Sequence, residues 1–141
     1  MTPLFAQVQA SFALSRTITQ NLTGAMLAQE GVELVRAVRD DNWFQGNPYD
    51  QDLRGCTGGC LIQYDDDAPQ SVGGRALLLD DAGRYQYTSG NETDFFRTIT
   101  IDIVSDGTTE FLRVTSEVSW AVRGKIRQVV VEDFLFDWLS P

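Results

Sequence analysis

Histidine is absent from this sequence of 141 residues, and its absence excludes every mechanism that depends on an imidazole. Serine triads, cysteine–histidine dyads and histidine-ligated zinc are therefore ruled out. Carboxylates are plentiful, but 14 Asp and 6 Glu make some close pair inevitable, so such a pair is no argument for a glycosidase. We expect no catalytic activity and no cofactor.

Basic residues and long apolar runs are also scarce. The 11 Lys and Arg against 20 Asp and Glu give a net charge of −9, and the bases are spread along the chain from Arg16 to Arg127. We therefore expect no basic patch and no nucleic acid or anionic lipid partner, because a negative chain repels phosphate groups. No stretch reaches the roughly 18 to 20 apolar residues that cross a bilayer, and no signal-peptide pattern opens the chain.

Only two cysteines occur, Cys56 and Cys60, within Gly-Cys-Thr-Gly-Gly-Cys-Leu. Two thiols are too few for a four-thiolate metal site, and their spacing is one residue wider than a redox Cys-x-x-Cys motif. We predict a disulfide that closes a small loop, and hence an oxidising compartment. Two reduced thiols in a cytosolic loop are the alternative.

One long helix is predicted from Pro3 to about Asp41, because this segment has no internal proline and is rich in helix-forming residues. Thr2 suits the N-cap and Pro3 the first helical position. The C-terminal half repeats apolar or small residues at steps of three and four, which predicts one face packed on a sheet. That face consists of Gly24, Leu27, Ala28, Gly31, Leu34, Val35 and Val38. Its glycines indicate a close approach to the sheet.

The rest of the chain predicts strands, so the expected fold class is α+β: a long N-terminal helix packed on an antiparallel β-sheet. With 43% apolar residues at the usual size of one domain, we expect a single domain over 1–141, in which 42–60 form a loop and 61–139 the sheet. Along the last strand the apolar residues change from one set of alternate positions to the other, which predicts a bulge or bend near Glu132 or Asp133. The predicted strands are 61–65, 75–80, 84–88, 97–103, 112–122 and 126–138, with a hairpin turn at 80–83.

Several charged side chains are candidates for structural ion pairs. Glu33, Arg36 and Asp40 lie at spacings that predict weak pairs of Arg36 with both acids on the outer face of the helix. Arg97 shares the parity of Ile99 and should point towards the helix, where a buried cation needs a carboxylate partner. We expect that partner to be Glu30 or Glu33.

The predicted helix is too long for the domain. About 39 residues span roughly 58 Å, whereas a compact chain of this size has a diameter of roughly 37 Å. The N-terminal half should therefore protrude, although it carries the apolar residues Leu4, Phe5, Val8, Phe12, Leu14, Ile18 and Leu22. Because a lone helix has no reason to expose such a face, we expect another chain to cover it. The alternative is a break near Ser15 or Gly24 that folds the helix back.

Residues 27–43, Leu-Ala-Gln-Glu-Gly-Val-Glu-Leu-Val-Arg-Ala-Val-Arg-Asp-Asp-Asn-Trp, resemble the end of the long helix in type IV pilin-like proteins, specifically minor pilins and pseudopilins. Residues 94–101, 114–120 and 134–138 resemble the same group. The resemblance implies a long helix on a small antiparallel sheet, an extracytoplasmic location and assembly with other pilin or pseudopilin subunits into a filament of bundled helices.

The sequence departs from this family at its start. The basic leader, the glycine cleavage site, the Phe-Thr-Leu-Ile-Glu-like start and the following apolar segment of the family are not found here. The chain begins near the point where that segment should end, so we expect Met1 to be an artificial start. Contact with the inner membrane would then run only through the missing segment.

Two loop motifs are candidate ligand sites. The acidic run Asp65 to Asp67, with Asp80 and Asp81, offers hard oxygen ligands for calcium, but its spacing matches no EF-hand, so we expect a solvated loop and no metal. The glycines from Gly55 to Gly59 lack the following helix and the Gly-Lys-Ser/Thr ending of a phosphate-binding loop. Two hypotheses remain: a non-catalytic filament subunit, and a secreted module that binds glycan or calcium through loops 47–59 and 65–74.

Overall fold

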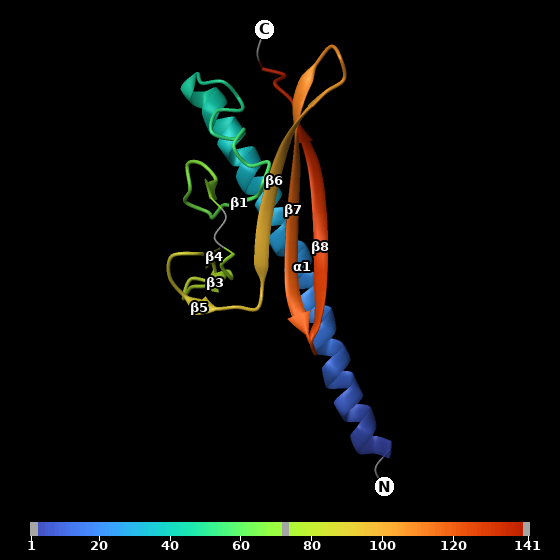
Figure 1. Ribbon diagram of the computed structural model, residues 1–141. Helices are drawn as coiled ribbons and strands as arrows, with labels where there is room; N and C mark the ends of the chain where they lie inside the picture. The colour runs from blue at the N-terminus through green and yellow to red at the C-terminus, as the bar shows by residue number, and fades with distance from the viewer. Residues whose placement is uncertain (1–2, 72–73, 140–141) are drawn as a thin grey trace.

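The structure, a computed structural model, describes residues 3–71 and 74–139 and has an α+β fold (Figure 1). Helix α1 (Pro3–Gln45) is followed by strands that form a five-stranded sheet, in the order β2-β1-β6-β7-β8, and a three-stranded sheet, in the order β4-β3-β5. All strand pairs are antiparallel. The strands are β1 (Cys60–Leu61), β2 (Gln70–Ser71), β3 (Leu78–Leu79), β4 (Tyr85–Gln86), β5 (Asn91–Glu92), β6 (Phe96–Ser105), β7 (Glu110–Val122) and β8 (Lys125–Leu135). The predicted fold class is confirmed at this level.

Helix α1 is continuous and longer than predicted. Its 43 residues correspond to about 65 Å, and its N-terminal part extends beyond the sheet (Figure 1). The break considered near Ser15 or Gly24 is therefore wrong. The helix ends at Gln45 because Gly46 adopts a positive φ of 78° and donates its backbone N–H to the carbonyl of Trp43 at 3.0 Å.

Strands β6, β7 and β8 form the main surface on which the helix packs. The β7–β8 register is constant from Leu112↔Leu135 to Val122↔Lys125, so of the predicted bulge or bend near Glu132 or Asp133, the bulge is wrong. Phe134 and Phe136, the aromatic residues that break the alternation of the last strand, do not enter the core. Phe134 and Phe136 lie beside Phe111, with ring centroids 5.7 and 4.8 Å away, and both remain partly exposed.

The segment between the helix and β6 forms shorter strands than predicted, together with two strands, β2 and β5, that were not predicted. The predicted strands 61–65, 75–80 and 84–88 contract to two-residue strands, although the hairpin turn at 80–83 does form between β3 and β4. Side chains replace much of the missing ladder. Gln63 accepts a bond from the backbone N–H of Tyr87 at 2.7 Å and donates to Asp65 at 2.7 Å, which joins the two sheets through a side chain.

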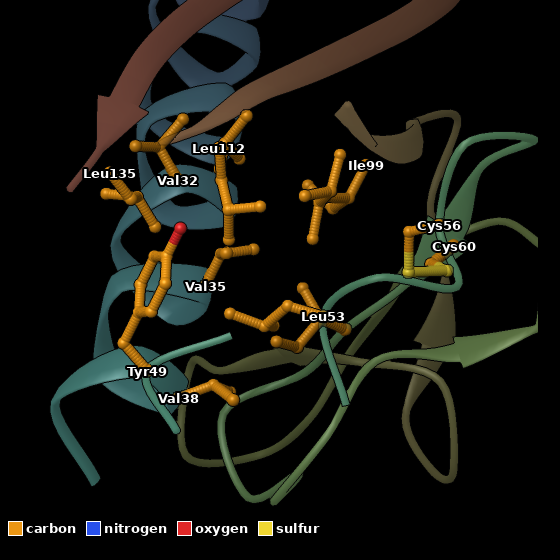
Figure 2. Close-up of a cluster of buried hydrophobic side chains, with 13 residues drawn as sticks. Val32, Val35, Val38, Tyr49, Leu53, Cys56, Cys60, Ile99, Leu112 and Leu135 are labelled. Atoms are coloured by element: carbon orange, nitrogen blue, oxygen red, sulfur yellow. A yellow bond between two sulfur atoms is a disulfide. The ribbon is translucent and has the colours of Figure 1, made fainter. Parts of the chain in front are cut away.

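The loop after α1 folds back and completes the core (Figure 2). Its Tyr49 and Leu53 lie with the disulfide against valines of the helix and residues of β6 to β8. Asn42, buried near the helix end, donates its amide to the carbonyls of Tyr49 at 3.1 Å and of Gln51 at 3.0 Å. The helix end therefore fixes the loop that covers it.

Candidate functional site

Helix α1 changes its surroundings at Gly24. From Ser11 to Thr23 no described side chain is buried, whereas Leu27, Ala28, Val32, Val35 and Val38 are buried against the sheet and the loop. Leu34, predicted for the same face, is half-buried at the edge of the core cluster. We call residues 3–23 the protruding half and residues 24–45 the packed half.

Two glycines allow the packed half to approach the sheet closely. A Cβ atom at Gly24 would lie 2.4 Å from the ring of Trp120, and one at Gly31 would lie 2.4 Å from Ser116 Oγ and 2.8 Å from Ile99 Cδ1. All three distances are shorter than van der Waals contact, so a side chain at either position would overlap the sheet. Glycine therefore allows the helix backbone to lie directly against the sheet. Gly31 thus lies on the predicted face, and Gly24 serves the same purpose one turn before Leu27.

Arg97 joins the helix to the sheet from within the core. Its side chain is fully buried, and Nη1 donates to Glu30 Oε1 at 2.8 Å and to the carbonyl of Leu27 at 3.0 Å. Nη2 donates to the carbonyl of Ile62 at 2.8 Å. The partner is thus Glu30 rather than Glu33, because Glu33 lies on the exposed face of α1. One cation connects α1, β6 and the segment after β1.

Arg36 forms the second link between helix and sheet. It donates to Glu33 at 2.6 Å and to Asp133 of β8. These hydrogen bonds raise the pKa of Arg36, and the hydrogen bond from Arg36 lowers the pKa of Glu33. The predicted pair with Asp40 is wrong: Asp40 accepts a bond from Arg39 instead, because Asp133 draws the Arg36 side chain towards β8.

The protruding half exposes large apolar side chains. Among the predicted residues, the exposed fractions are 71% for Phe12, 61% for Leu14, 50% for Ile18 and 67% for Leu22. The side chains of Leu4, Phe5 and Val8 lie outside the described part of the structure. Met26, also 50% exposed, continues the four-residue spacing of Leu14, Ile18 and Leu22, and this spacing could have identified it from the sequence.

These four residues at steps of four form one line, which we call the apolar strip: Leu14, Ile18, Leu22 and Met26. Because each step of four residues turns by about 40° around the helix, the strip winds from Leu14, which borders the side that faces the β7–β8 hairpin, to Met26, which lies opposite the buried residues. After Met26 the same side carries polar and charged residues, beginning with Gln29 and Glu33. The apolar strip therefore has a defined end, at the point where the opposite face begins to pack on the sheet.

A second exposed apolar surface lies at the other end of α1. A groove of about 450 Å³ is lined by Trp43, Phe44 and Trp138, with Arg39 and Asp40 beside them. Phe44 is 90% exposed, and the rings of Trp43 and Trp138 meet edge to face at 5.4 Å. Sequence reasoning missed this groove because Trp43 and Trp138 are distant in the sequence.

The acidic loops have structural partners. Asp66 accepts bonds from the backbone N–H of Gln63 and from the side chain of Gln70, and Asp80 accepts bonds from Ala82, Arg84 and Gln86. The backbone N–H of Arg84 is the main cause of the lowered pKa of Asp80. Within residues 3–71 and 74–139, no three carboxylates or thiols gather as metal ligands.

Four of the basic residues, distant in the sequence, lie together in space. Arg16 of the protruding half lies with Arg123, Lys125 and Arg127 of the β7–β8 hairpin around one hollow of about 530 Å³. The expectation of no basic patch is therefore wrong. It failed because Arg16 and the hairpin are about a hundred residues apart, and only the long antiparallel β7–β8 pair brings the hairpin down to this part of the helix (Figure 1).

Comparison of the chain with protein-family profiles, with curated proteins and with solved structures gives no match. Across the described residues, no helix carries an apolar stretch long enough to cross a membrane. The candidate site is the apolar strip on the protruding half of a helix whose packed half is joined to the sheet by Arg97 and Arg36.

Proposed function

We propose that this protein is a non-catalytic structural subunit of the minor pilin or pseudopilin type, and that it assembles through α1 into a filament of the type IV pilus or type II secretion class. The observation that carries the proposal is the apolar strip on a continuous helix that extends beyond its sheet. Water-exposed apolar side chains in one line are typical of a surface that packs on another helix.

The charge of the helix supports the same function. Residues 3–29 contain one charged residue, Arg16, and it lies beside the β7–β8 hairpin rather than among the strip residues. Bundled helices exclude water, so a charged strip would need a partner for each charge, whereas Leu, Ile and Met need none. The Cys56–Cys60 disulfide supports an extracytoplasmic location, because disulfides persist in oxidising compartments.

Glutamate substitutions in the full-length protein test the proposal. Ile18→Glu and Leu22→Glu place a carboxylate in the apolar strip without changing helix propensity strongly. We expect both variants to fold but to be lost from sheared filaments, because the carboxylate would be buried without a partner. Immunoblots of the filament fraction, compared with the cell fraction, measure the loss.

Gln29→Glu is the matched control, since it adds the same charge on the same side of the helix but beyond the apolar strip. It should enter filaments normally. Asp66→Ala, in an acidic loop, should also enter normally. Normal incorporation of Ile18→Glu and Leu22→Glu would refute the filament role. A secreted binding module predicts the reverse: neutral helix variants, and loss of calcium or glycan binding on changing loops 47–59 and 65–74.

A further inference from the structure

The bases of this protein fall into two groups in the described part of the structure. Six arginines form ion pairs with carboxylates, and Arg75 lies over the ring of Tyr87 at 5.4 Å. The other four bases are Arg16, Arg123, Lys125 and Arg127, and none has a carboxylate within 4.0 Å among residues 3–71 and 74–139. These four surround one hollow. Of the five bases without a carboxylate partner in the described residues, four are therefore concentrated in one place, and Arg75 lies apart from them.

This basic hollow lies where the β7–β8 hairpin meets the protruding half of α1 (Figure 1). The helix contributes Arg16, Thr17 and Gln20, and the hairpin contributes the other three bases. All four bases are exposed to solvent. Leu14 and Val122 also line it. The hollow therefore offers cations and hydrogen-bond donors to an anionic group, with apolar side chains beside them.

Charge is divided unequally along the long axis of the molecule. Residues 3–29 and 118–131 contain these four bases and no acid, whereas the rest of the chain carries all 20 acids and seven bases. One end thus has a charge of +4 and the remainder a charge of −13. A negatively charged plane would attract the hairpin end and repel the body, which orients the molecule with its protruding half towards that plane.

We propose that the basic hollow binds the phosphate groups of an anionic membrane surface. Juxtamembrane basic residues are attracted to anionic lipid, and apolar side chains beside them add to the binding by entering the interface. Such side chains lie close to the bases on both elements: Phe12 and Leu14 precede Arg16 on the helix, and Ile126, 71% exposed, lies next to Lys125 and Arg127 on β8 but on the opposite face of that strand. The inference does not rest on the proposed filament role, because it depends on the four bases and requires no assembly, although Leu14 of the apolar strip also lines the hollow.

A planar membrane fits these observations better than a nucleic acid or a second protein does. A nucleic acid that extended past the hairpin would approach the rest of the molecule, whose net charge is −13, and would be repelled. A membrane plane touches only the basic end. An acidic protein surface would match the cations but would not explain the exposed apolar residues interleaved with them. The arrangement of charge and apolar surface together favours lipid.

Flotation of the full chain with vesicles tests the proposal. The probes are vesicles of phosphatidylcholine alone and of phosphatidylcholine mixed with phosphatidylglycerol. We expect binding only to the anionic vesicles, and loss of binding between about 0.05 and about 0.5 M salt, since salt screens the attraction. Arg123→Gln/Arg127→Gln should weaken binding by roughly 25-fold, at about fivefold for each charge removed near the surface.

Arg84→Gln/Arg113→Gln is the matched control, because it removes the same charge from two exposed arginines that are paired with carboxylates on the body. It should bind anionic vesicles as the unchanged protein does. Equal loss in both double variants, binding to neutral vesicles, or no vesicle binding by the unchanged protein would overturn the proposal. So would self-association in sedimentation that Arg123→Gln/Arg127→Gln abolishes without vesicle binding, since the hollow would then contact a second copy.

Discussion

The two halves of α1 are about equally rich in apolar residues, yet one is packed and the other is exposed. The packed half has glycines where the sheet approaches and valines at its most buried positions, which suits a tight contact with a flat surface. The protruding half has leucine, isoleucine and phenylalanine in exposed positions instead. Apolar content alone therefore does not decide burial; the residue types indicate which kind of partner each face fits.

The position of charge separates the halves further. The packed half pairs Glu30 with Arg97 and Arg36 with Asp133 of the sheet, and Glu33 on its exposed face holds Arg36. The protruding half has only Arg16, which lies in the basic hollow. Charged side chains thus help to hold the packed half in position on the sheet. They are nearly absent from the protruding half, whose proposed partner is another helix.

The sharpest test of this difference compares two leucines in the same helix. Leu27→Ala should lower the free energy of unfolding by about 3 kcal/mol, because it leaves a cavity in the core. Leu22→Ala should change it by less than about 0.5 kcal/mol, because the side chain is exposed. Urea denaturation measures both. Similar losses in the two variants would show that the protruding half is packed in solution.

The ion pair in the core gives the next largest effect. Glu30→Ala leaves the buried Arg97 cation without its carboxylate and should cost about 3 kcal/mol. Glu30→Leu/Arg97→Met removes both charges and should recover most of this loss, because an apolar pair has no buried charge to solvate. A double-mutant cycle in urea denaturation gives the coupling energy. An additive result would mean that the two side chains act independently.

Close approach at Gly31 predicts a loss of about 2 kcal/mol for Gly31→Leu, since the new side chain overlaps Ser116 and Ile99. The helix propensity of leucine works in the opposite direction by roughly 0.6 to 1 kcal/mol. Ala37→Leu, on the exposed side of the packed half, is the control and should be nearly neutral. Thermal unfolding distinguishes them: an unchanged or raised Tm for Gly31→Leu would place that position in solvent.

Reduction of the disulfide should affect the packed half alone. The disulfide closes a loop of five residues, and by the loop-entropy relation it stabilises the fold by about 2 kcal/mol because it restricts the unfolded chain. The two buried cysteines lie in the core cluster that contains Val35 and Val38. Hydrogen exchange should rise in the loop and in residues 32–45 after reduction, but not in residues 11–22. Intact mass after alkylation without reductant checks the starting state; two added alkyl groups would contradict the disulfide.

The smallest effect concerns pH. The hydrogen bond from Arg36 lowers the pKa of Glu33 in the folded state, so this carboxylate stabilises the fold above its unfolded pKa of about 4.3. The contribution is lost as the pH falls through the lower folded value. It should amount to at most about 0.5 kcal/mol, because solvent screens the pair. Glu33→Gln should therefore lower stability slightly at pH 6 and not at pH 2, as measured by urea denaturation.

Much of the candidate site could be predicted from short stretches of sequence. The three- and four-residue steps of α1 identified its packed face and most of the apolar strip, and alternation along β6 placed Arg97 towards the helix. The disulfide was predictable because its cysteines are four residues apart. The aromatic residues of the last strand were misread, since alternation shows that Phe134 and Phe136 share a face but does not show which face is covered.

The sequence by itself determined the long helix, the strand parity and the exposed strip, because each depends on residues within one or two turns or along a single strand. Only the tertiary structure decided that Arg97 meets Glu30, that Arg36 reaches Asp133, and that Arg16 joins the three bases of the β7–β8 hairpin. These contacts join residues separated by about 70 to 110 positions. They depend on how the helix crosses the sheet. The crossing is set by the packing of the whole helix face against the sheet face around Gly24 and Gly31, and not by any local sequence pattern.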